Sequence, residues 1–173
     1  MAETSKIVSF DNEPLMLVDS DDVVIGFEEK AAAHRGDGVL HRAFSIFLFN
    51  DHGEVLLQQR STLKPLWPGY WSNTCCSHPR RGESLAQATE RRLKEELNLE
   101  SQLTFLFKFQ YHAVFNDIGS EHELCSVFVG KMTGRPEPDF NPTEIATTCL
   151  LYTSPSPRDQ RGSGFPACGC KKK

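Results

Sequence analysis

A single strong helical pattern limits what this chain can fold into, because its other apolar segments have the patterns of β-strands. Between residues 84 and 98, apolar side chains recur every three or four positions, which places them along one face of a helix. Ser84 and Gln87, at the start of this segment, match a helix capping box. A helix with one apolar face must bury that face against another layer, which here has to be built from strands.

The candidate strands lie on both sides of this helix. Residues 44–49 are apolar on both faces, which is typical of a central buried strand. Apolar side chains alternate through residues 103–111 and should line one face of a strand. Further strands are predicted at residues 15–18, 23–26, 55–60 and 124–132, with a short helix at 28–34. Because strict β–α–β alternation is absent, the predicted fold is an α/β sandwich, a mixed β-sheet flanked by helices.

Length and charge narrow the class of protein. A chain of 173 residues with 39% hydrophobic residues can bury a single-domain core. Residues 1–148 hold 14 Lys+Arg and 22 Asp+Glu, a net charge of −8. This charge argues against nucleic acid as a partner, and an anionic substrate would need local cations or metal ions.

The sequence also indicates where in the cell the protein acts. No apolar run reaches the roughly 20 residues that span a bilayer, and the first ten residues do not resemble a signal peptide. The six cysteines do not suggest a disulfide scaffold, which suits a reducing environment. We therefore expect a cytoplasmic protein with a small-molecule partner and neither nucleic acid nor membrane as a partner. The oligomeric state is left open.

The last 25 residues differ from the rest of the chain. Residues 149–173 hold five Lys+Arg against one Asp, and their two Ser-Pro pairs and Gly-rich end predict a disordered segment. The stretch CLLYTSPSPRD at residues 149–159 also resembles the translation of a sequencing-library adapter. We expect a domain at residues 1–148, incomplete at its C-terminus, followed by a non-native tail at residues 149–173.

The motif NTCCSHP at residues 73–79 places a thiol two residues from an imidazole. Such a pair can act as a nucleophile, as an acid/base pair or as part of a metal site. The spacing does not match a structural zinc site. Burial of Cys75 and Cys76 as small hydrophobic residues is the simpler alternative.

A second polar motif is Glu121-His122-Glu123, at the start of a predicted strand. Strand residues two apart share a face, so both carboxylates point one way and His122 points the other. Two adjacent carboxylates repel unless they share a proton or a cation, although an exposed charged strand end is an equal alternative. With His34, His41 and His78, these carboxylates would form a mixed nitrogen and oxygen cage for Mn, Zn, Fe or Mg.

The predicted helix carries a third pattern. Glu83, Arg91 and the following KEE sequence lie close to the Nudix signature, in which helix carboxylates hold a divalent cation against a diphosphate. Ser77, Arg92 and Asn98 depart from that signature. A solvated helix face with charge pairs four residues apart is the alternative.

Together, LHRAFSIFLFN at residues 40–50, LLQQR at 56–60, NTCCSHP, RRLKEEL at 91–97 and EHE resemble the type I isopentenyl-diphosphate isomerases of the Nudix superfamily, over about residues 15–145. The resemblance implies a Nudix-like sandwich that interconverts isopentenyl and dimethylallyl diphosphate, a step of isoprenoid precursor biosynthesis. It implies Mg²⁺ at the diphosphate and a second divalent metal (Mg²⁺, Mn²⁺ or Zn²⁺) at the His/Glu cage.

The resemblance also implies roles for individual residues. Cys76 and Glu123 match the acid/base pair, and Tyr111 the tyrosine beside it. The cage ligands would be His34, His41, His78, Glu121 and Glu123, while Glu96 and the main-chain oxygen of Cys76 would hold Mg²⁺. The diphosphate-binding cations would be Lys30, Arg60, Lys64 and Arg92. Two alternatives remain: a Nudix pyrophosphohydrolase, which Arg92 in place of a glutamate disfavours, and an inactive truncated fragment of the isomerase.

Overall fold

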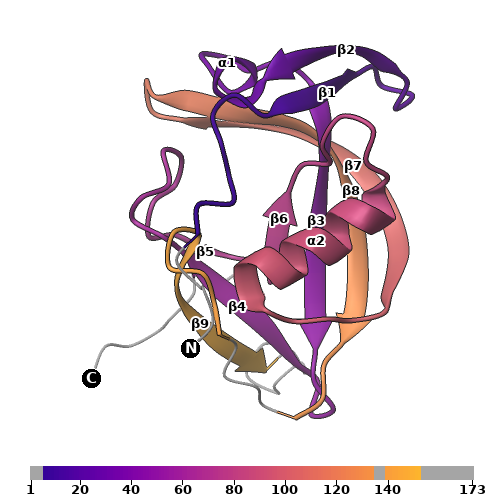
Figure 1. Cartoon of the computed structure of the whole chain (residues 1–173), viewed down its shortest axis with the longest axis vertical. Coiled ribbons are helices and arrows are strands. Elements are labelled where there is room, and N and C mark those ends of the chain that lie inside the picture. The colour runs from indigo at the N-terminus through magenta and orange to yellow at the C-terminus, as the bar shows by residue number, and fades with distance from the viewer. Residues whose placement is uncertain (1–5, 135–138, 153–173) are drawn as a thin grey trace, which may run out of the picture.

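The computed structural model describes residues 6–134 and 139–152 and consists of a curled mixed β-sheet with one long helix (Figure 1). The strands are β1 (Pro14–Val18), β2 (Val24–Glu29), β3 (His41–Phe49), β4 (Glu54–Arg60), β5 (Trp71–Ser72), β6 (Cys75–Ser77), β7 (Leu103–Phe115), β8 (Gly119–Lys131) and β9 (Ile145–Tyr152). The helices are α1 (Lys30–Ala33) and α2 (Leu85–Leu97). The predicted mixed-sheet fold is confirmed, but α1 is one turn long, so within the described ranges a single long helix flanks the sheet.

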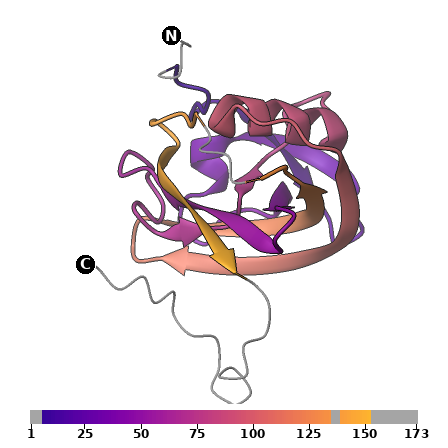
Figure 2. The same ribbon diagram turned by 90° about the horizontal axis from the view of Figure 1, so that it is seen from below.

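Strand β3 lies at the centre of the sheet. It runs parallel to β8 along its whole length and antiparallel to β1, β4 and β6, while β7 pairs with β8 and β9 with β4. This combination of parallel and antiparallel neighbours makes the sheet mixed. Figure 2 shows the sheet curling round, with α2 along one side and the long β7 along the other.

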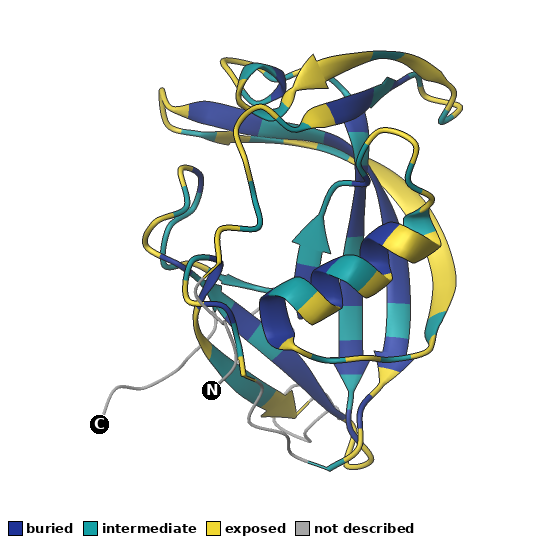
Figure 3. Ribbon diagram, viewed as in Figure 1, coloured by how far each residue is buried: buried dark blue, intermediate teal, exposed yellow. Residues whose placement is uncertain are grey.

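One face of β3 forms the core with α2. Phe44, Ile46 and Leu48 are completely buried and pack with Leu93 and Leu97 of the helix. The predicted capping box is present, because Ser84 accepts from the backbone N–H of Gln87 and the Gln87 side chain accepts from the Ser84 N–H. Figure 3 shows the alternation of buried and exposed residues along α2 that this packing requires.

The other face of the sheet carries polar side chains. Residues that pair across strands share a face, and the register places His41 beside Glu123 and Glu123 beside Tyr111. Ser45 is paired with Cys76 on the same side of β3. The two faces of β3 therefore serve different purposes: one buries apolar area, and the other assembles ionisable groups.

Strand β7 departs from the predicted pattern. A register shift between Phe105 and Phe107 leaves Leu106 outside the ladder with β8. Such a bulge reverses the side on which the following residues lie. Phe107, Phe109 and Tyr111 share the polar face, whereas Phe105 contacts the core residue Phe128. The expectation that all alternating residues from 103 to 111 line one face is therefore wrong.

Strand β9 crosses the boundary expected at residue 148. Residues 149–152 pair with β4, from Cys149 opposite Leu57 to Tyr152 opposite Glu54, and Leu150 packs against the core. Backbone pairing with β4 and the packing of Leu150 on the core support this extension, which composition alone did not reveal. The remainder of the expected tail lies outside the described residues. No described helix is long and apolar enough to cross a membrane.

Candidate active site and metal centre

Three histidines from separate segments meet on the polar side of β3. His34 follows α1, His41 begins β3 and His78 follows β6. Their ring centroids lie 4.7 to 5.2 Å apart, and the Nε2 atoms of His41 and His78 are 3.1 Å apart. One potential ligand atom from each histidine and one from Glu123 lie within 4.8 Å of one another. Nitrogen and carboxylate donors at this spacing fit a divalent metal ion.

Backbone carbonyls orient two of these rings. The Nδ1 atoms of His34 and His41 lie 2.7 Å from the carbonyl oxygens of Lys30 and Val39, where each can donate a hydrogen bond. This tautomer leaves the Nε2 lone pair free to face the cluster, which is the arrangement of metal-binding histidines. Desolvation and the nearby His41 lower the pKa of His34 to about 4, so its ring is neutral near pH 7.

The carboxylates of β8 are joined by one phenol. The hydroxyl of Tyr111 lies 2.7 Å from a Glu123 oxygen and 2.9 Å from a Glu121 oxygen. Desolvation and the charge of Glu123 raise the pKa of Glu121, whereas the adjacent His41 and His78 outweigh burial and lower the pKa of Glu123. Glu121 is outside the four-residue cluster, so among the described residues the structure gathers four of the five expected cage ligands.

Cys76 lies beside this centre in a cavity of about 170 Å³. Tyr111 and Glu121 line the same cavity, together with Arg60 and Trp67. Desolvation raises the pKa of the Cys76 thiol to about 11, so the thiol carries its proton near pH 7. Cys75, the alternative within the motif, is completely buried on the core side.

The loop that forms one wall of the cavity is strained. Trp67 has a φ of +46°, a conformation that bulky side chains rarely adopt. Its ring lies against Phe115 at a centroid distance of 5.1 Å, and Arg60 donates two hydrogen bonds to the carbonyl of Leu66. These contacts hold an indole ring at the cavity, where its π electrons can face a developing positive charge.

Three of the expected diphosphate-binding cations lie together near α2. Desolvation lowers the pKa of Lys30 to about 8, and the charges of Lys64 and Arg92 add to this effect. Arg92 is buried and forms an ion pair with Glu96 at 2.5 Å. The fourth cation, Arg60, is separate from this group and lines the Cys76 cavity.

Glu144 is a site residue that the sequence did not indicate. Its Oε2 atom lies 2.5 Å from the Lys64 amine and 3.3 Å from Arg92, and its backbone carbonyl accepts from Ser61 N–H. Nothing in its local sequence distinguishes it from the other acidic residues. Its position depends on residues 141–145 folding against the start of the 61–64 turn.

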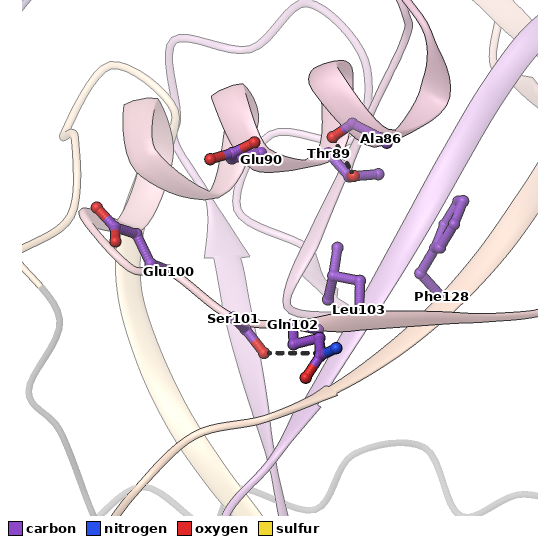
Figure 4. Close-up of a pocket in the computed structure, with 8 residues that line it drawn as sticks. All are labelled: Ala86, Thr89, Glu90, Glu100, Ser101, Gln102, Leu103 and Phe128. Carbon is purple, nitrogen blue, oxygen red and sulfur yellow. Dashed lines mark hydrogen bonds between the residues drawn. The ribbon is translucent and has the colours of Figure 1, made fainter.

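A larger cavity of about 520 Å³ lies elsewhere, between α2 and the segment that leads into β7 (Figure 4). Two of its lining side chains are carboxylates, Glu90 and Glu100, and none is cationic. It therefore does not suit a diphosphate. The lining residues are Ala86, Thr89, Glu90, Glu100, Ser101, Gln102, Leu103 and Phe128.

The fold and the site together define a Nudix protein. The NUDIX domain model matches residues 39–156. A solved structure, DR0079 from Deinococcus radiodurans, superposes with a TM-score of 0.65 at 26% identity and covers 80% of this chain and 83% of its own. A MutT protein from Methanosarcina mazei, at 18% identity and a TM-score of 0.52, shares the fold.

Sequence relatives narrow the class further. The isopentenyl-diphosphate Delta-isomerase 1 of Photorhabdus laumondii is 48% identical over 136 residues, which cover 78% of this chain and 76% of that protein. The isopentenyl-diphosphate Delta-isomerase of Burkholderia multivorans is 48% identical over 128 residues, covering 74% and 72%. The chain belongs to the isopentenyl-diphosphate Delta-isomerase family of Nudix proteins.

Proposed function

We propose that this protein interconverts isopentenyl and dimethylallyl diphosphate, with Cys76 and Glu123 as the two proton-transfer groups and Tyr111 beside them. The main support is the position of the thiol: Cys76 and Tyr111 line one cavity, and the Tyr111 hydroxyl is hydrogen-bonded to Glu123. A proton must be added to one carbon of the substrate and removed from another. Cys76 lines the cavity, and Glu123 is joined to the cavity wall through Tyr111, so two proton-transfer groups are available to one substrate.

The reaction moves a double bond without changing the overall composition of the substrate. One group donates a proton to the terminal alkene carbon, which forms a tertiary carbocation. The other removes a proton from the carbon nearer the diphosphate, and the C–H electron pair forms the new double bond. The carbocation must be kept from water, and the Trp67 ring at the cavity wall can stabilise its charge.

The cage of His34, His41, His78 and Glu123, with Glu121 beside it, would hold one divalent ion. Glu96 and the main-chain oxygen of Cys76 would hold Mg²⁺ at the diphosphate. When bound, these ions supply positive charge against the carboxylates and the phosphates. Lys30, Lys64 and Arg92 would bind the diphosphate through charge-assisted hydrogen bonds, and Arg60 would bind it from the cavity side.

The site disfavours hydrolysis of the diphosphate. Nudix hydrolases use a carboxylate to help activate water at the position held here by Arg92. A guanidinium cannot accept that proton, because arginine remains charged at all accessible pH values. Its ion pairs with Glu96 and Glu144 further fix it as a cation. The proposed function is therefore isomerisation rather than cleavage. We propose that the protein acts in the cytoplasm.

The direct test is to incubate the purified chain with isopentenyl diphosphate and Mg²⁺ and to follow dimethylallyl diphosphate. We expect conversion, and a loss of at least about 100-fold in kcat for Cys76→Ala, because a proton-transfer group is removed. Cys125→Ala is the control, since this thiol donates to Ser45 rather than lining the cavity. Release of phosphate or pyrophosphate in place of isomerisation would support the hydrolase alternative. A folded chain that turns over neither way would support the alternative of an inactive fragment.

A further inference from the structure

The middle residue of the Glu121-His122-Glu123 motif has no part in the proposed reaction. Its neighbours on both sides face Tyr111, so His122 lies on the opposite face of the sheet. There the β7–β8 register places it directly opposite His112. A second group of imidazoles, which are potential metal ligands, thus lies behind the first, on the other side of the same hairpin.

The spacing of this outer pair matches that of the inner cage. The ring centroids of His112 and His122 are 4.9 Å apart, with the planes inclined at 45°. The three pairs of the inner cage span 4.7 to 5.2 Å, and in one of them two ring nitrogens lie 3.1 Å apart. The outer rings are therefore close enough for both to bind one ion.

Gln110 provides a third donor. It lies on the same face as His112, two residues earlier in β7, and its amide Nε2 atom is 3.2 Å from His122 Nε2. The amide oxygen takes this place when the side chain turns by 180°, because the two ends of the amide have nearly the same shape. Ligand atoms bonded to a tetrahedral metal at about 2.0–2.1 Å are about 3.4 Å from each other, so the observed spacing suits neighbouring ligands.

We propose that His112, His122 and Gln110 form a surface site for a late first-row divalent transition metal ion, separate from the catalytic cage. Two imidazoles and one amide oxygen favour Cu²⁺, Ni²⁺ and Zn²⁺ over Mg²⁺, which prefers carboxylate, carbonyl and water oxygens. His112 is exposed, so water can complete the coordination. The long antiparallel ladder holds the backbones of His112 and His122 opposite each other before the ion arrives, and this lowers the entropy cost of binding.

The test is a calorimetric titration of the full chain with Ni²⁺. Wild type should bind one Ni²⁺ more than either His112→Asn or His122→Asn, and Mg²⁺ should not occupy this site. His52→Asn removes an exposed histidine from the β3–β4 turn and should keep the wild-type stoichiometry. Isomerase activity measured with Mg²⁺ should be unchanged in His112→Asn. Equal stoichiometry in all four proteins would overturn the proposal.

A second measurement separates a shared site from binding to single histidines. Ni²⁺ is paramagnetic and broadens the imidazole resonances of the residues that bind it. Those of His112 and His122 should broaden together, at Ni²⁺ concentrations that leave His52 unaffected. In His122→Asn, broadening of His112 should require at least about tenfold more Ni²⁺. Broadening of His112 at the same concentration as in wild type would mean that each ring acts alone, which contradicts the proposal.

Discussion

At the scale of single residues, Glu144 fixes the charges that would bind the diphosphate. One of its oxygens contacts both Lys64 and Arg92. The positive charges of these two residues outweigh burial and lower the pKa of Glu144. A lysine on a flexible stem loses much rotamer freedom when it binds a ligand. Glu144 holds the amine of Lys64 in place beforehand, so that part of this loss has already occurred in the free protein.

We therefore expect Glu144→Gln to raise the KM for isopentenyl diphosphate roughly tenfold, or about 1.4 kcal/mol, with kcat changed less than about twofold. Loss of the fixed ion pair acts on substrate binding and not on the proton transfers. Steady-state kinetics would measure the change in KM, and the affinity for inorganic pyrophosphate would measure the change in diphosphate binding. Glu100→Gln, at an exposed pair with Lys94, is the matched control. An unchanged or lower KM would contradict this role.

At the scale of secondary structure, the turn of the β1–β2 hairpin is tied to the main sheet by one carboxylate, in addition to the pairing of β1 with β3. Arg42 of β3 donates to Asp22 at 2.6 Å and to its carbonyl at 2.7 Å, and Lys108 of β7 donates to the other carboxylate oxygen. Burial alone would raise the pKa of Asp22, but these two partners lower it below its usual value. The hairpin carries the segment that leads into His34, so its attachment also supports the cage.

This contact predicts a pH-dependent stability. A carboxylate whose folded-state pKa is lowered stabilises the protein above its unfolded pKa of about 3.9 and loses that effect as the pH falls through the folded value. Asp22→Asn should cost about 1 kcal/mol at pH 7 and much less near pH 2.5. Asn tolerates the φ of +65° found here, so the change removes mainly charge. Urea unfolding at both pH values measures the loss in the free energy of unfolding. An equal loss at both pH values would contradict a role for the Asp22 charge.

The elements that the sequence predicted are those whose pattern is local. The capping box at Ser84 and the apolar stripe define α2, and residues apolar on both faces define the centre of β3. The parallel pairing of β3 with β8 joins His41 to Glu123 across 82 positions, and no local pattern encodes it. The sequence therefore supplied the residue types of the site, whereas the cage exists only because distant strands are neighbours. Glu144 could not be found for the same reason.

At the scale of the whole molecule, apolar side chains of β7 remain on the surface. Phe105, Leu106, Phe107 and Phe109 are each between 41 and 54% exposed, and β7 pairs only with β8 among the described residues. An apolar strand with one unpaired edge is a template for pairing with another chain. Several neighbouring exposed aromatic residues also exceed what scattered surface positions normally show. We expect this protein to associate through β7 as its concentration rises.

Leu106 is the position at which to test this association. It lies at the bulge, outside the ladder with β8 and 51% exposed, so a charge there does not enter the core. Leu106→Lys should reduce light scattering at high concentration at least twofold without lowering Tm by more than about 2 °C, because a lysine on an edge strand opposes strand pairing. Val114→Lys makes the same kind of change at an exposed position of the same strand, 58% exposed but outside the aromatic segment. If both variants reduce scattering equally, the aromatic segment is not the specific contact; if only Leu106→Lys does, the segment around Leu106 is the contact.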